Sequence, residues 1–69
     1  MIDLNVIRRF LVCHEALDGF CVTSGGKLFD GHFLVRAASS VEACEKLAVL
    51  IADASAKGVP VWHLPDVIE

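Results

Sequence analysis

The stretch Ser39–Gly58, SSVEACEKLAVLIADASAKG, decides the fold because it carries the start and stop signals of one long helix. Ser39 and Glu42 form an S-x-x-E capping box, in which two side chains satisfy free backbone N–H groups at the helix start. Gly58 suits a left-handed C-terminal cap. The sequence therefore predicts a helix over residues 40–57.

One broad apolar face of this helix is expected to pack on a sheet. Its members recur at helical spacing: Val41, Cys44, Leu47, Ala48, Ile51 and Ala54. Ala43 and Leu50 widen the face beyond the roughly 100° stripe that one layer needs, and Val49 lies among the polar residues. We therefore expect the helix surface around Val49 and Leu50 to contact a partner.

Two segments before the helix have the composition of strands. Phe20–Thr23 and His32–Arg36 are rich in β-branched and aromatic residues, and turn residues flank both. Between them, Ser24-Gly25-Gly26 can adopt the positive φ angles that a tight turn demands. After the helix, Val59–Leu64 predicts a final short strand that ends before Pro65.

The first segment of the chain fits two structures. Phe10–His14 has the residue types of a strand, and Asp18-Gly19 would join it to the next strand through a turn. A helix is the alternative, with one face at Leu4, Ile7, Leu11 and His14. Asp3 would then be the N-cap and Gly19 the stop. We favour the strand, because β-branched and aromatic residues are dense in this segment.

These elements predict a single α+β domain over residues 1–69. The order β-β-β-α-β gives a small antiparallel sheet of three to four strands packed on one long helix. A chain of 69 residues leaves no room for a second domain. A domain of this size buries only about 60% of its unfolded surface, so small domains often gain stability by oligomerisation.

The composition is unusually apolar for a small chain. Hydrophobic residues make up 55% of the sequence, yet the longest uninterrupted apolar run is Leu47–Ala52. A membrane-spanning helix needs roughly 18 such residues, so we expect no membrane association. The excess apolar surface instead predicts contact with a second copy, as a homodimer, or with another protein.

The charge pattern argues against nucleic acid as a partner. The formal net charge is −3, whereas nucleic-acid-binding domains carry a basic stripe or patch. Arg8-Arg9 is the only adjacent basic pair. We interpret these two arginines as a solvated face or a protein contact.

The cysteine pattern predicts a reducing compartment. Cys13, Cys21 and Cys44 are odd in number, and the N-terminal residues lack the pattern of a signal peptide. We therefore expect a cytoplasmic protein without disulfides, in which the three cysteines are small apolar core residues.

No residue pattern predicts a metal site, a cofactor or catalysis. Structural zinc sites show close pairs such as C-x2-4-C, and neither Cys13 nor Cys21 belongs to one. No spacing places a nucleophile beside a base, and Gly25-Gly26 lacks the context of a phosphate-binding loop. We expect a protein that is not an enzyme.

Residues from about Phe10 to Ala56 resemble the N-terminal half of HicB-type antitoxins. Three stretches carry the resemblance: Phe10-Leu11-Val12, Gly19-Phe20-Cys21-Val22 and Ser39-Ser40-Val41-Glu42-Ala43. The family's Pro-containing loop after the second strand is here Ser24-Gly25-Gly26. The resemblance implies a β-β-β-α domain related to part of the ribonuclease H fold. It also implies an antitoxin-like role.

The segment between Pro60 and Pro65 holds the only tryptophan, Trp62, beside His63. Tryptophan is enriched in binding hot spots, so Trp62 and His63 are candidates for a protein contact. The alternative is that Trp62 closes the end of the core by packing on the helix.

Together these features predict a small non-catalytic protein-binding module that regulates or inhibits another protein as a homodimer. Bacterial and phage inhibitors have this character. The candidate interaction residues are Trp62, His63, Val49, Leu50, Arg8 and Arg9. The alternative is a regulator that binds a small ligand or nucleotide at a dimer interface, with polar contacts from His32, Arg36, Arg8 and Arg9.

Overall fold

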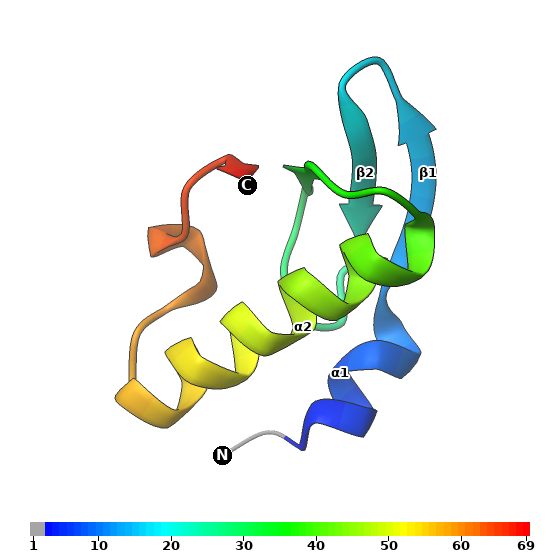
Figure 1. Ribbon diagram of the computed structural model, residues 1–69. Coiled ribbons are helices and arrows are strands. Elements are labelled where there is room, and N and C mark those ends of the chain that lie inside the picture. Colours follow the sequence, from blue (N-terminus) through cyan, green and yellow to red (C-terminus); the bar gives the residue numbers. More distant parts are fainter. Residues whose placement is uncertain (1–2) are drawn as a thin grey trace.

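The protein is a two-layer α+β domain in the computed structural model, which describes residues 3–69 (Figure 1). The elements follow in the order α1 (Leu4–Phe10), β1 (Val12–Ala16), β2 (Gly19–Thr23), β3 (His32–Val35), α2 (Ser40–Lys57), the 3-10 helix η1 (Val61–His63) and β4 (Val67–Ile68). The predicted α+β class, with one long helix packed on a small sheet, is confirmed.

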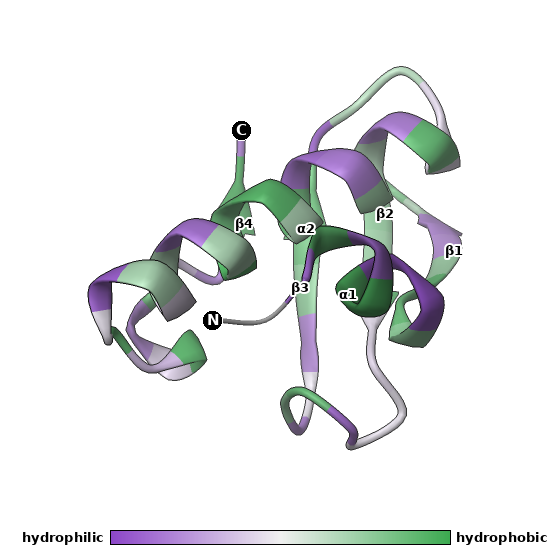
Figure 2. Cartoon of the chain, turned by 90° about the horizontal axis from the view of Figure 1, so that it is seen from below, coloured by the Kyte–Doolittle hydropathy of each residue, from purple (hydrophilic) through white to green (hydrophobic). Residues whose placement is uncertain are grey.

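Helix α2 has the predicted bounds because both of its ends are capped as the sequence indicates. The backbone N–H of Glu42 donates to Ser39 Oγ at 3.2 Å, and Gly58 adopts a left-handed φ of 71°. The Glu42 carboxylate reaches one residue further back than in a standard capping box, and accepts from the Ala38 N–H at 2.9 Å. The ribbon of α2 alternates between hydrophobic and hydrophilic segments along its length (Figure 2).

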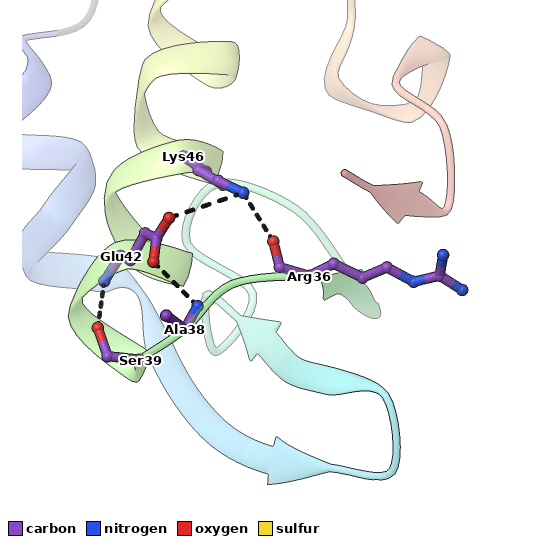
Figure 3. A network of polar contacts seen from close by, with 5 residues as sticks. All are labelled: Arg36, Ala38, Ser39, Glu42 and Lys46. Carbon is purple, nitrogen blue, oxygen red and sulfur yellow. Dashed lines mark hydrogen bonds and ion pairs between the residues drawn. The ribbon is translucent and has the colours of Figure 1, made fainter.

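A small polar network ties the start of α2 to the end of β3 (Figure 3). Lys46 Nζ donates to the Arg36 carbonyl at 2.8 Å and lies 3.9 Å from the Glu42 carboxylate. Lys46 therefore links the second turn of the helix to the backbone directly after β3.

The first segment contains both of the structures that its sequence fits. Helix α1 begins after Asp3, whose carboxylate accepts from the Asn5 N–H at 2.8 Å, but it ends at Phe10. Strand β1 then begins at Val12, two residues later than expected. The helix forms here because it buries Ile7 completely and brings Leu11 into the core. This stabilisation comes from tertiary packing, which the residue types of the segment do not reveal.

The sheet has four strands in the order β1-β2-β3-β4. The first three strands pair antiparallel, as expected, and a turn at Leu17-Asp18 joins β1 to β2. Strand β4 instead pairs parallel to β3, with Val35 opposite Ile68. This direction follows from topology, because a helix that crosses over the sheet returns the chain parallel to the strand it left.

The final strand lies beyond the segment predicted for it, so the prediction of a strand over Val59–Leu64 is wrong. Pro60 has a φ of −64° and starts the 3-10 turn η1, in which the His63 N–H donates to the Pro60 carbonyl at 3.0 Å. Only after Pro65 does the chain return to the sheet, where the Arg36 N–H donates to the Ile68 carbonyl at 2.8 Å.

The core lies between the sheet and the two helices. Its members are Ile7, Leu11, Val22, Phe33, Val35, Ala43, Leu47, Ala48, Ile51 and Ile68. Val41 was expected on this face but is 78% exposed. At 100° per residue, Val41 lies roughly 100° from the centre of the buried stripe, which Leu47 and Ile51 occupy. No helix among residues 3–69 is both long and apolar enough to cross a bilayer.

Gly19 lies where the β1–β2 hairpin passes closest to the end of β3. Its φ is 152°, and a Cβ atom there would lie 2.4 Å from the carbonyl oxygen of Val35. The substitution Gly19→Ala should therefore lower the free energy of unfolding by about 3 kcal/mol or more, through backbone strain and overpacking. Urea denaturation measures this loss.

Gly25→Ala is the matched control, because Gly25 also has a positive φ of 63° but has nothing within 4 Å of the added Cβ. It should cost only about 1–2 kcal/mol. Equal losses for the two variants would show that the contact with Val35 does not constrain the fold.

Candidate functional site

The side of the sheet opposite the helices forms the candidate site, and we call it the outer face. The strand register places these residues on it: Val12, His14, Ala16, Gly19, Cys21, Thr23, His32, Leu34 and Val67. Val12 and Val67 are 47% and 40% exposed, and Leu34 is half-buried without packing against the core. Both helices lie on the other side of the sheet, where α1 packs on α2 and α2 packs on β1 to β3.

One row of the outer face crosses all four strands. His14 pairs with Cys21, Cys21 with Leu34, and Leu34 with Val67. Neighbouring strands lie about 4.8 Å apart, so these side chains form a continuous band about 14 Å long. Its centre is the apolar pair Cys21 and Leu34.

The outer face carries no Asp, Glu, Lys or Arg at any of its positions. Antiparallel sheets that face water on one side normally alternate between apolar and polar residues along each strand. Glu15 is the only charged residue within the described strands, and its register opposite Phe20 places it on the side of the helices. The strand positions of the outer face are therefore uncharged, while Asp30 and Asp66 line a hollow beside His32, Leu34 and Val67.

A second feature lies on the opposite side, where β1 meets the first turns of α2. Cys44 donates an S–H···S hydrogen bond to Cys13 with the two Sγ atoms 3.0 Å apart, and Cys13 donates to the Ser40 carbonyl at 3.5 Å. Both thiols line an open groove with Arg8 and Val41. None of the three cysteines is fully buried, so the expectation of three core cysteines needs correction. Cys13 and Cys44 pack at the edge of the core, and Cys21 lies on the outer face.

Burial raises the pKa of Cys13 to about 12 from an ordinary value of 9.0, and the neighbouring Cys44 side chain contributes to the rise. The thiolate of Cys13 is therefore disfavoured in the folded chain. Among residues 3–69, no three His, Cys, Asp or Glu side chains lie close enough together to hold a metal ion.

The structure places Trp62 and His63 together on η1, at the far end of the helical layer. Their rings meet edge to face with centroids 6.3 Å apart. Trp62 is 80% exposed, so the alternative in which it closes the core is wrong. It lines a hollow beside Phe29 and Phe33, and Phe33 belongs to the core.

The other predicted contact residues lie on separate surfaces. Val49 is 49% exposed and shares a hollow with Leu50. The charged residues around that hollow are Glu42, Glu45, Lys46 and Glu69. Arg8 and Arg9 occupy the last turn of α1, where positive charges interact favourably with the helix dipole.

The polar residues expected to hold a small ligand are not gathered into one site. Arg8 forms an ion pair with Glu45, and Arg36 pairs with Glu69 at 2.7 Å. His32 lies on the outer face and lines a different hollow from Arg8. The ligand-binding alternative stays a prediction from the sequence.

The outer face and the thiol pair were both missed by the reasoning from sequence. The sequence did contain a signal for the outer face. Phe20–Thr23 and His32–Val35 contain no charged residue among either their core-facing or their outward-facing positions. No local signal existed for the second, because Cys13 and Cys44 are 31 positions apart and only the packing of β1 on α2 brings them together.

Comparisons of this chain with protein-family models, curated proteins and solved structures found no match. Its fold and its surfaces therefore carry the functional argument.

The raised pKa of Cys13 predicts a loss of stability at alkaline pH. The unfolded chain releases the thiol proton near pH 9, while the folded chain holds it up to about pH 12. The free energy of unfolding should therefore fall as pH rises from 9 towards 12. Cys13→Ala should weaken this dependence, as measured by urea denaturation at several pH values in a phosphine reductant.

Cys21→Ala serves as the control, since Cys21 lies on the other side of the sheet. It should keep most of the alkaline dependence of the parent chain, because the charge of Cys21 is the smallest of the contributions that raise the Cys13 pKa. A Cys13→Ala profile that is identical to the parent profile would contradict the assignment to Cys13.

Proposed function

We propose that this protein is a small, non-catalytic regulatory module that binds another protein and acts as a homodimer, with two copies joined through their outer faces. The observation that carries the proposal is the outer face itself, which spans four strands without a charged residue. The proposal covers an antitoxin-like or inhibitor-like role, which the resemblance to HicB-type antitoxins implies.

Electrostatics favours a second copy on this face. Each chain has a formal net charge of −3, so two copies repel wherever their carboxylates approach. Contact centred on the uncharged strand positions would strip no charged strand residue of its water, and Asp30 and Asp66 would lie at the border of the contact. A two-fold axis would bring the Cys21–Leu34 centre of each band onto that of the other copy.

The helix surface at Val49 and Leu50 and the free edge of β1 are less suitable for self-association. The hollow at Val49 and Leu50 lies among four charged side chains, Glu42, Glu45, Lys46 and Glu69, which association there would strip of water. The free edge of β1 carries Glu15 on its helix side, and inward-pointing charges are a known protection against edge pairing.

The partner protein would bind at the opposite layer of the molecule. Trp62 belongs to η1, which packs on α2 rather than on the outer face, so the proposed dimer leaves it accessible. Exposed tryptophan beside an aromatic hollow is a typical anchor for a protein interface. The three free thiols fit a reducing compartment, which supports action in the cytoplasm.

The dimer is tested by introducing a charge at the centre of the outer face. Light scattering of the parent chain at high micromolar concentration should give twice the chain mass of 7.5 kDa. Leu34→Glu should give the mass of one chain, because like charges would face each other across the axis. His14→Glu, at an exposed position of the same band, should weaken association without disturbing the core.

Val41→Glu is the matched control, since Val41 is 78% exposed but belongs to α2. It should leave the dimer mass unchanged, and circular dichroism should show all three variants folded. A parent chain with the mass of a monomer, or a folded His14→Glu variant that associates like the parent, would contradict the proposal.

The partner-binding surface is tested with Trp62→Ala. The parent chain, used as bait in a lysate of its native host, should retain one stoichiometric protein, and the variant should lose it. Trp62 is 80% exposed, so the change should alter stability by less than about 0.5 kcal/mol. Equal capture by both baits would exclude Trp62 as the anchor.

A further inference from the structure

The two thiols at the junction of β1 and α2 form a site that the proposed dimer does not use. The Sγ atoms of Cys13 and Cys44 are 3.0 Å apart although the residues are 31 positions apart in sequence. Cys13 faces the helices, because its cross-strand partner Val22 is fully buried in the core. The proposed dimer interface therefore leaves this pair free.

We propose that Cys13 and Cys44 are a reversible oxidation site, which a low-molecular-weight disulfide of the glutathione class converts to an intramolecular disulfide. The geometry requires little movement. A disulfide bond is about 2.05 Å long, so the two sulfur atoms need to approach by about 1 Å from their separation of 3.0 Å.

The pair by itself supplies two thiols, whereas a structural zinc site takes four protein ligands. No third His, Cys, Asp or Glu within the described part of the chain completes a group with them.

The pair is accessible to a small oxidant. Both thiols are half-buried and line an open groove, whose other residues are Arg8, Ser40, Val41 and Glu45. Val41, at the rim, is 78% exposed. A peptide disulfide can therefore approach the sulfur atoms without unfolding the domain.

The reaction consists of two thiol–disulfide exchanges. Cys44 loses its proton to solvent, and its thiolate attacks one sulfur of the oxidant, which forms a mixed disulfide and releases one thiolate. Cys13 then loses its proton and attacks Cys44 Sγ, which releases the second thiolate. The released thiolates take up the two protons. The two cysteines lose two electrons, and the oxidant gains them as two thiols.

The product would tie the edge strand β1 to the second turn of α2. The bond closes a loop over residues 13–44, which includes β2 and β3. A cross-link across a loop of this length substantially restricts the conformations of the unfolded chain. Oxidation should therefore raise Tm by roughly 10–20 °C. In the oxidised form, β1 can no longer separate from the helix.

The test treats the reduced, folded protein with oxidised glutathione and follows it by intact mass and by peptide mapping. The parent chain should lose the mass of two hydrogen atoms, yield a peptide that links Cys13 to Cys44, and melt at a higher temperature. A phosphine reductant should reverse all three changes.

Three single variants separate the proposed pair from any other pairing. Cys13→Ala and Cys44→Ala should show no rise in Tm with the oxidant and should end as glutathione adducts. Cys21→Ala should form the same linked peptide as the parent chain and show a similar rise. Adducts without a linked peptide in the parent chain, or a linked peptide that contains Cys21, would overturn the proposal.

Discussion

The packing of α2 against β1, β2 and β3 is the contact on which the rest of the structure depends. Leu47 and Ile51 are at most 1% exposed, and they meet Val22 and Val35 from the sheet in one core. Because α1 adds Ile7 to this same core, both helices are used on one side of the sheet. Within residues 3–69 the helices pack on this one side of the sheet, which leaves the outer face open in the single chain.

Under the proposed function, that asymmetry would give the two sides of the molecule different roles. The strand positions of the outer face carry no Asp, Glu, Lys or Arg and would suit a second copy, whereas the helical side carries the thiol pair and Trp62. A dimer built on the outer face would present two copies of each helical side to the surroundings. Partner binding at Trp62 and oxidation at Cys13 and Cys44 would then take place on surfaces that dimer formation does not cover.

The parts of the fold that the sequence predicts are those with local signals. Ser39 and Gly58 define α2 because caps act within one turn, and β2 and β3 follow from β-branched and aromatic runs between turns. Strand β4 could not be predicted, because two residues pair with β3 only after the helix has returned them to it. Similarly, only tertiary packing decides that Trp62 is exposed and that Cys13 meets Cys44.

The central claim, that a second copy covers the outer face, is tested most directly by methyl NMR with a soluble paramagnetic agent. Val12 and Val67 on the outer face are 47% and 40% exposed in one chain, and Val49 on α2 is a matched valine at 49%. At concentrations that favour the dimer, the methyl signals of Val12 and Val67 should stay sharp while those of Val49 broaden. Equal broadening of all three, or protection of Val49 alone, would contradict the account.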